Sequence, residues 1–159
     1  MSVGPRVVFV RFLTSESPKL NPWVSHSARV LGAAPAPAVT AEGDVVVWQL
    51  VSANNRQLAR GASVHRSFES AHESALAVVA AGESLSVSLV SEAGRGVYGW
   101  YASLDGEPAM TCSRWYLTDR DRRYSIDIAM RSVAVASLHS GARLTDPALM
   151  GGDRGTGIS

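Results

Sequence analysis

Residues 97–116 read VYGWYASLDGEPAMTCSRWY, and this stretch decides the fold. Val97 to Ser103 is rich in β-branched and aromatic residues, which favour a strand. Asp105-Gly106 is a favoured two-residue hairpin turn, and Pro108 to Tyr116 then predicts the returning strand. The sequence therefore predicts an antiparallel hairpin.

A helix and a closing strand are predicted after this hairpin. Thr118 followed by Asp121 resembles a capping box with aspartate in place of glutamate, and the positive end of a helix dipole stabilises acids in the first turn. We expect this helix to run to about Met130. Residues 132–138 alternate valines with small residues, which is typical of either a closing strand or the end of the helix, and we choose the strand.

The same order of elements is predicted in residues 44–92. The strands there alternate or carry long apolar runs, and the helix has a serine as N-cap and a glycine as stop signal. The predicted elements are a strand at 44–52, a turn at Asn54-Asn55, a strand at 57–64, a helix from Ser67 to Ala81 that ends at Gly82, and a strand at 85–90.

The two segments superpose in sequence. A shift of 51 residues lays Ser67 on Thr118 and Ala75 on Ile126. We therefore predict an α+β fold in which two tandem β-β-α-β repeats, residues 44–92 and 96–139, share one mostly antiparallel sheet with helices packed on one face.

The remaining residues flank this two-repeat domain. Arg6 to Leu13 predicts an extra N-terminal strand, and residues 14–42 carry four prolines and predict a long connection in which only 28–31 suits short regular structure. Residues 1–43 thus precede the domain at 44–139, and the glycine-rich residues 140–159 predict a flexible tail. If the N-terminal strand lies on an open edge it would invite a second chain, which favours a homodimer.

The second segment resembles the YegP-like family of small proteins. Trp100, Asp105-Gly106, Ser113-Arg114-Trp115-Tyr116 and Ile126 carry the resemblance, which extends over roughly residues 44–138. The first segment departs from that pattern, because Asn55 replaces the turn glycine and Ala62 and His65 replace the serine and tyrosine. The resemblance implies the fold, and paired units that complete one sheet by exchanging their last strands. It implies no activity.

Composition narrows the class of protein. Apolar residues make up 46% and charged residues 18% of the 159 residues, which predicts a folded chain. The net charge of +1 provides no global field to attract nucleic acid or anionic lipid. With no run of about 20 apolar residues, no secretion signal and the single cysteine Cys112, we expect a cytoplasmic protein that does not contact membranes.

No motif for catalysis, a metal or a cofactor stands out. His65, His72 and His139 lack the spacing of a helical metal site, and surface or packing roles are much commoner for such residues. Cys112 or Ser113 with a histidine would make a nucleophile and base, but neither has an activating sequence context. The glycine-rich stretches 94–99 and 151–157 do not fit phosphate-binding motifs. We expect no catalytic residue, metal or cofactor.

The most suggestive cluster alternates aromatic rings with guanidinium groups. Such a mixture suits single-stranded nucleic acid, because bases stack on rings while arginines meet phosphates. The alternative is a solvated helix face on which Arg120 and Arg123 pair with Asp119, Asp121 and Asp127. The members of this possible contact region for nucleic acid or a partner are Arg114, Trp115, Tyr116, Arg120, Arg122, Arg123 and Tyr124.

The preferred hypothesis for function is a non-enzymatic interaction module that self-associates or binds another protein. The alternative is an accessory protein that binds RNA or single-stranded DNA through the residue 114–124 region, and a small hydrolase comes third. These hypotheses are separable, because phosphate-driven binding weakens steeply with salt.

Overall fold

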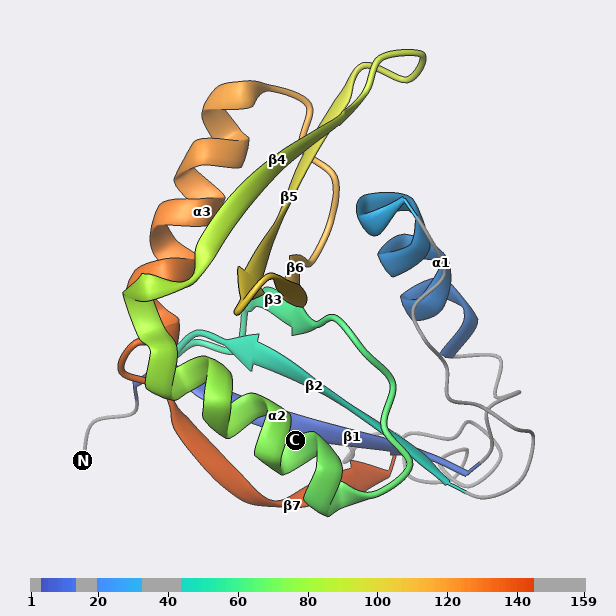
Figure 1. Cartoon of the computed structure of the whole chain (residues 1–159), viewed down its shortest axis with the longest axis vertical. Helices are drawn as coiled ribbons and strands as arrows, with labels where there is room; N and C mark the ends of the chain where they lie inside the picture. The colour runs from blue at the N-terminus through green and yellow to red at the C-terminus, as the bar shows by residue number, and fades with distance from the viewer. Residues whose placement is uncertain (1–3, 14–19, 33–43, 145–159) are drawn as a thin grey trace.

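The structure, a computed structural model, describes residues 4–13, 20–32 and 44–144. One seven-stranded sheet runs through them in the order β4-β5-β6-β3-β2-β1-β7, and three helices pack on it (Figure 1). The α+β prediction with a mostly antiparallel sheet is confirmed. The elements are β1 Arg6–Phe12, α1 Leu20–Leu31, β2 Val45–Val51, β3 Gln57–Gly61, α2 Phe68–Ala81, the short 3-10 turn η1 Gly82–Ser84, β4 Ser86–Glu92, β5 Val97–Leu104, β6 Glu107–Cys112, α3 Asp119–Val133 and β7 Ser137–Leu144.

Both predicted hairpins are present, and their turns show why those residues stand there. Asp105 and Gly106 have φ angles of 55° and 85°, the left-handed pair that a tight hairpin turn requires. In the turn between β2 and β3, Asn55 has a positive φ of 67° but Asn54 does not, and the hydrogen bond from Ser52 N to the Arg56 carbonyl closes a turn of three residues. Asparagine and aspartate tolerate this region better than other non-glycine residues, so each turn is built from residues that fit it.

Helices α2 and α3 cover the same face of the sheet, and each is fixed at its start as the sequence predicts. Ser67 Oγ accepts a hydrogen bond from Ser70 N, and Thr118 Oγ1 accepts one from Asp121 N. Gly82 ends α2, as expected. Because each cap satisfies an otherwise unpaired N–H group, it sets the residue at which its helix begins.

A buried tryptophan on the sheet contacts each of these helices. Trp48 Nε1 donates to Ser74 Oγ on α2, and Trp100 Nε1 donates to Ser125 Oγ on α3. The segments β2-β3-α2-β4 and β5-β6-α3-β7 also share their order of elements. That the two segments are copies of one repeat stays a prediction.

The backbone comes closest to one of these rings at Gly61. A Cβ atom at Gly61 would lie 2.6 Å from the indole ring of Trp48. Only glycine leaves room for the ring at this point of β3, so the residue is fixed by packing.

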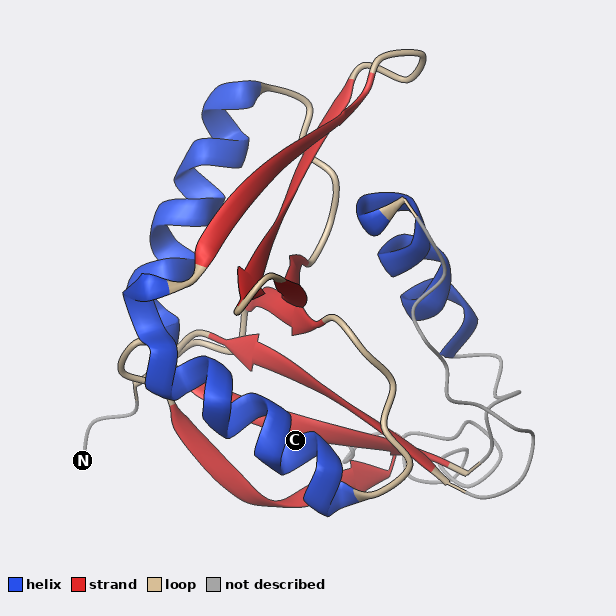
Figure 2. Ribbon diagram, in the orientation of Figure 1, coloured by secondary structure: helices blue, strands red, loops and turns tan. Residues whose placement is uncertain are grey.

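The opposite face of the sheet carries a helix where the sequence predicted a connection. Helix α1 spans Leu20–Leu31 and packs Leu20 and Trp23 against Val45 and Val47 of β2. Figure 2 shows α1 across the sheet from the other two helices. The expected long connection is therefore wrong over residues 20–31, and helices lie on both faces rather than one; the rest of it, at 14–19 and 33–42, lies outside the described residues.

The N-terminal strand lies inside the sheet. β1 pairs antiparallel with β2 from Arg6–Val51 to Phe12–Val45, and it pairs parallel with β7 on its other side. The idea that β1 offers an open edge to a second chain is wrong, because both of its edges are occupied. The sheet ends instead at β4 and β7.

The closing strand exists but begins later than predicted. Helix α3 continues to Val133, and β7 spans Ser137–Leu144. Residues 140–144, which we expected in a flexible tail, therefore belong to a strand, while the rest of the predicted tail lies outside the described residues. β4 pairs with β5 of the second segment, whereas β7 pairs with β1 and not with the first segment.

Candidate ligand-binding pocket

A surface pocket of about 390 Å³ lies between α3, the start of β3 and the chain that follows β6. Three of the predicted contact residues, Arg114, Tyr116 and Tyr124, line it, and the other half of the chain contributes Arg56. We call this the arginine–tyrosine pocket. Its lining residues are Arg56, Gln57, Leu58, Ser113, Arg114, Tyr116, Asp121, Tyr124, Ser125 and Ile128.

A chain of hydrogen bonds fixes the tyrosine of this pocket. Trp100 Nε1 can only donate, so Ser125 Oγ accepts its proton at 3.0 Å. The Ser125 hydroxyl in turn donates to Tyr116 Oη at 2.8 Å. The phenol proton of Tyr116 therefore has no acceptor among the described residues, and it remains available to a molecule in the pocket.

The pocket lining contains more positive than negative charge: two arginines and one aspartate. The guanidinium of Arg114 lies over the Tyr116 ring, 5.1 Å from its centroid. Arg56 and Arg114 together face one carboxylate in the lining, that of Asp121. A lining of two guanidinium groups, two phenols and one carboxylate suits a ligand that carries an anionic group beside a hydrogen-bond donor.

The structure divides the predicted cluster between the two faces of the sheet. Trp115 points to the α1 side, where its ring lies under the Arg29 guanidinium at 5.0 Å and 6.0 Å from the His26 ring. A Cβ atom at Gly99 would lie 2.9 Å from the Trp115 ring, so that ring is closely packed. Trp115 therefore does not share a surface with Tyr116.

The arginines of α3 also separate. Arg122 is buried: it lies over the Tyr98 ring, pairs with Asp119 and donates from Nη1 to the Val90 carbonyl at 3.1 Å. Arg123 is exposed and pairs with Asp119, and neither arginine lines the pocket. The predicted pairing with an acid along the helix is found for Arg123, whereas the pairing of Arg122 was not predicted.

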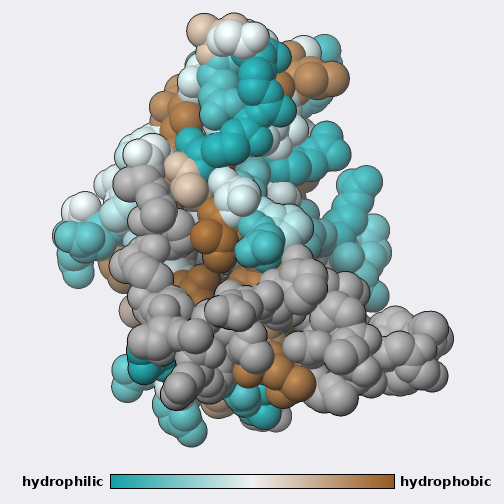
Figure 3. Space-filling model, turned by 90° about the vertical axis from the view of Figure 1, so that its right-hand side faces the viewer, coloured by the Kyte–Doolittle hydropathy of each residue, from teal (hydrophilic) through white to brown (hydrophobic). Residues whose placement is uncertain are grey.

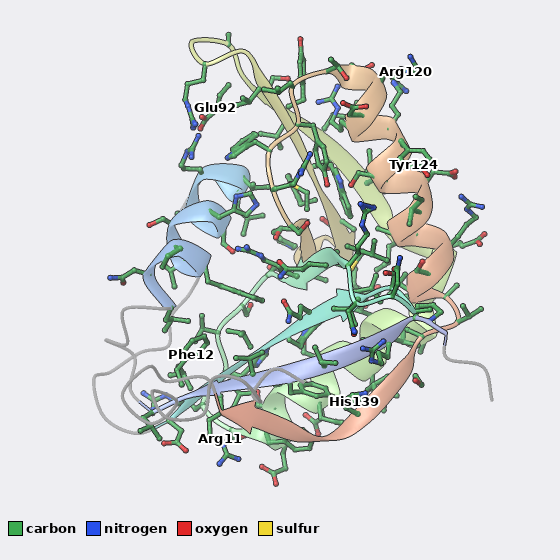
Figure 4. The ribbon with its side chains drawn as sticks, turned by 180° about the vertical axis from the view of Figure 1, so that it is seen from behind. Arg11, Phe12, Glu92, Arg120, Tyr124 and His139 are labelled. Carbon is green, nitrogen blue, oxygen red and sulfur yellow. The ribbon has the colours of Figure 1, made fainter. Side chains whose placement is uncertain are left out.

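Arg120 and Tyr124 point outward from α3 (Figure 4). Tyr124 is 68% exposed and forms one wall of the pocket, whereas Arg120 lies outside its lining. The surface expected for nucleic acid is therefore reduced to Arg114, Tyr116 and Tyr124 in the pocket, with Arg120 and Arg123 outside it.

A second group of polar side chains lies between α1 and the sheet. The Arg60 guanidinium stacks on Trp23 at 4.6 Å, and Arg29 pairs with Glu92 at the far end of the helix. Figure 3 shows this side of the molecule, where hydrophilic side chains gather towards the top of the view. Burial lowers the pKa of Arg60, since a charge there is only partly solvated.

Cys112 and His26 meet in this layer but do not form a nucleophile and base. His26 Nε2 lies 2.9 Å from the Cys112 carbonyl oxygen, so it is the protonated nitrogen, and it is 3.9 Å from Sγ. Burial raises the pKa of the Cys112 thiol and lowers the pKa of His26. A protonated Nε2 cannot accept the thiol proton, so this geometry does not activate the cysteine.

Two of the other histidines have packing surroundings in the structure, whereas His139 is exposed on β7. His65 Nδ1 lies 2.9 Å from Ser70 Oγ, and His72 stacks on Phe9 at 5.6 Å. Among the described residues no three His, Cys, Asp or Glu side chains come together as a metal site would require. No helix in the same part of the chain is long and apolar enough to span a bilayer.

Sequence reasoning missed Arg56, Arg60 and His26. Arg56 belongs to the first hairpin and reaches the pocket because β3 pairs with β6, bringing Ala59 opposite Cys112. The prediction that both segments share one sheet implied that their hairpins could meet. The sequence did not show that β3 pairs with β6, which is the pairing that places Arg56 beside Arg114.

The comparisons with known proteins add a structural similarity. No protein-family model matches the chain, and no curated protein matches it. Among solved structures, it is similar to the solution NMR structure of yegP from E. coli, a protein of unknown function, with 13% identity and a TM-score of 0.49. The similarity covers 61% of this chain and 83% of that chain.

Proposed function

We propose that the chain is a non-enzymatic protein-binding module whose arginine–tyrosine pocket binds a carboxylate of a partner protein. The observation that carries this proposal is the hydrogen-bond chain through Ser125, in which Tyr116 Oη accepts a proton and so keeps its own phenol proton for a ligand acceptor. Arg114 and Arg56 stand beside that donor. Guanidinium groups bind carboxylates through short, paired, charge-assisted hydrogen bonds, so an Asp or Glu side chain or a C-terminus suits this lining.

The charges around the pocket favour a protein ligand over nucleic acid. Asp121 lies in the lining, so a phosphate bound between Arg56 and Arg114 would face a carboxylate. A peptide carries its negative charge at one point and can place a donor beside Asp121. Its neutral groups would contact Leu58 and Ile128, and the volume falls within the range of about 300–1,000 Å³ typical of ligand pockets.

A displayed library of random seven-residue peptides tests this proposal. Peptides selected on the wild-type protein are expected to be enriched in Asp, Glu or a free C-terminal carboxylate. Binding of the selected peptides should weaken on Arg114→Gln, which removes one charge, and on Tyr116→Phe, which removes only the phenol group. Arg120→Gln is the matched control, because Arg120 lies on the pocket's helix but outside the lining.

Two outcomes would contradict the proposal. One is peptide binding that Arg114→Gln and Arg120→Gln weaken equally, since the charge of the helix rather than the pocket would then be responsible. The other is failure to select any peptide while an oligo-thymidine strand binds and leaves as salt rises, which is the behaviour of a phosphate-driven site. The second outcome would favour the nucleic-acid alternative.

The proposed location of this activity is the cytoplasm. The single cysteine is buried and reduced, which supports this location.

The proposal that the two β-β-α-β segments are repeats is supported by their matching tryptophan–serine contacts. The second segment supplies Arg114 and Tyr116 to the pocket. The first segment has His65 at the position that corresponds to Tyr116, so its equivalent stretch lacks the tyrosine.

A further inference from the structure

Strand β4 forms one end of the sheet and lacks the usual protection of an edge. It pairs with β5 over its whole length, from Ser86–Ser103 to Glu92–Val97, and no described strand pairs with its other side. Its sequence, SVSLVSE, contains no lysine, arginine or proline. Such residues normally keep a free edge from pairing with another chain, so β4 is open to that pairing.

The hydrogen bonds of β5 show which backbone groups of β4 face outward. Tyr98 exchanges both backbone hydrogen bonds with Tyr116, at 2.8 Å each, so its N–H and C=O point away from β4. Ser91 lies opposite Tyr98, and in an antiparallel pair its own N–H and C=O must then point to the open edge.

The same reasoning applies two and four residues earlier. Trp100 N donates to Cys112 Sγ on β6 at 3.4 Å, so Leu89, which lies opposite Trp100, also directs its backbone outward. By the alternation of the ladder, Val87 does so too. Val87, Leu89 and Ser91 therefore present a regular row of unpaired donors and acceptors.

Two apolar side chains accompany this row. Leu89 is 50% exposed and Val87 is 37% exposed, and both lie on the sheet face that carries Trp100 and α3. An exposed apolar pair on an unpaired edge is costly in water, and a strand added alongside would cover it.

We infer that the strand added to this edge is β4 of a second copy of the chain, running antiparallel about a two-fold axis at Leu89. That register pairs Leu89 with Leu89 of the second copy, and it pairs Val87 with Ser91 in both directions. All these residues point their backbone groups to the edge, so each pair is a hydrogen-bonded one. Closed two-fold pairing of identical surfaces is the commonest form of homo-oligomer.

Charge supports a second copy as the occupant. Glu83 lies in η1 before β4 and Arg95 lies in the turn after it, so the two-fold axis places the end of one copy that carries Arg95 beside the end of the other copy that carries Glu83. Glu83 is exposed, and the Arg95 side chain, which pairs with Glu92 of its own chain at 3.0 Å, is still 54% exposed. Glu92 would face an uncharged serine, Ser86, so the register contains no like-charge pair. This dimer is separate from the arginine–tyrosine pocket and does not depend on the proposed function.

Light scattering of the full chain during size-exclusion chromatography, over a wide concentration range, tests the inference. The wild-type protein is expected at twice the chain mass of 16.8 kDa. Leu89→Lys should reduce it to one chain mass, because each copy would place a charge at the centre of the pairing. Leu117→Lys is the matched control, since Leu117 is 77% exposed outside β4, and it should leave the mass unchanged.

Two further measurements separate loss of pairing from loss of folding. Glu83→Arg should lower the dimer fraction, and adding Arg95→Glu to the same chain should restore it. Amide hydrogen exchange should slow at Val87, Leu89 and Ser91 as the concentration rises, while Ser88 and Val90, already bonded to β5, stay unchanged. A wild-type mass of one chain at all concentrations, or a Leu89→Lys variant that is folded and still dimeric, would overturn the inference.

Discussion

The indole nitrogen of Trp100 lies 3.0 Å from Ser125 Oγ, and this hydrogen bond ties α3 to the middle of β5. Trp100 is fully buried, so its N–H group must find a partner inside the protein. The bond also sets the direction of the next one, from Ser125 to Tyr116. One serine thus connects the hydrophobic core to the floor of the pocket.

Replacing Ser125 with alanine should destabilise the protein by about 1–3 kcal/mol, because the buried Trp100 N–H would lose its acceptor. Chemical denaturation followed by tryptophan fluorescence measures the change. Ser74→Ala is the matched variant in the first segment, where the bond to Trp48 is longer at 3.4 Å, and its cost should be smaller. Equal losses of unfolding free energy in the two variants would contradict the expectation that the shorter Trp100–Ser125 bond contributes more to stability.

Replacing Arg122 with methionine should cost about 1.5–3 kcal/mol, the usual range for hydrogen bonds that involve a charged group. The Arg122 side chain is 7% exposed; it donates a hydrogen bond to the Val90 carbonyl of β4 and forms an ion pair with Asp119. Arg123→Met removes the other partner of Asp119 from an exposed position and should change the free energy of unfolding far less. The same denaturation experiment compares them, and a larger effect at Arg123 would refute this account of α3.

Stability should fall as the pH drops below 6.5, because of His26. Burial lowers the pKa of His26 below its usual value of 6.5, and the nearby Arg60 and Arg29 lower it further, while the bond to the Cys112 carbonyl opposes them. The unfolded chain therefore binds a proton first, and the stabilisation present above pH 6.5 is lost as the pH falls towards the pKa of the folded protein. The carboxylate of Glu92, on the α1 side of the sheet, pairs with Arg29, which is one of the two arginines that act on His26.

Urea denaturation at a series of pH values, on the wild type and on His26→Gln, measures this loss. One proton gives at most about 1.4 kcal/mol per pH unit, and less here because His26 is partly solvated. The variant should lose stability less steeply with acid. Burial lowers the pKa of His65 as well, so a residual slope is expected in the variant. Identical slopes in the two proteins would contradict the role of His26.

The elements that sequence predicted are those with strong local signals. The Asp105-Gly106 turn and the caps at Ser67 and Thr118 each depend on a few adjacent residues, and all three are present. Local chemistry of this kind can be read from one sequence because its partners are near along the chain.

Helix α1 was missed although its buried residues have helical spacing. Leu20, Trp23, Ser27 and Val30 form one face, but Pro22 and a serine within that face made the stretch look irregular. Pro22 lies in the first turn, where a proline costs no hydrogen bond within the helix. The stability of α1 comes from the sheet beneath it, which local propensity does not report.

The candidate site was predicted only in part, because the sequence does not show to which face of the sheet each side chain points. Trp115 and Tyr116 are adjacent in sequence, and one faces α1 while the other lines the pocket. Arg122 shares the helix of Arg120 but is turned into the sheet. Composition alone showed that rings and guanidinium groups were close together; which of them share a surface depends on the twist of the sheet and the packing of α3.

Strand β1 has a consequence for synthesis of the chain. It is made first, and its partner β2 follows soon after, but its other edge must wait until Ser137–Leu144 has left the ribosome. The backbone of Ser137 then bonds to Pro5, which joins the two ends of the described fold. A truncation that removes β1 would leave β7 with no strand to pair with, so β7 depends for its place on a strand made much earlier in synthesis.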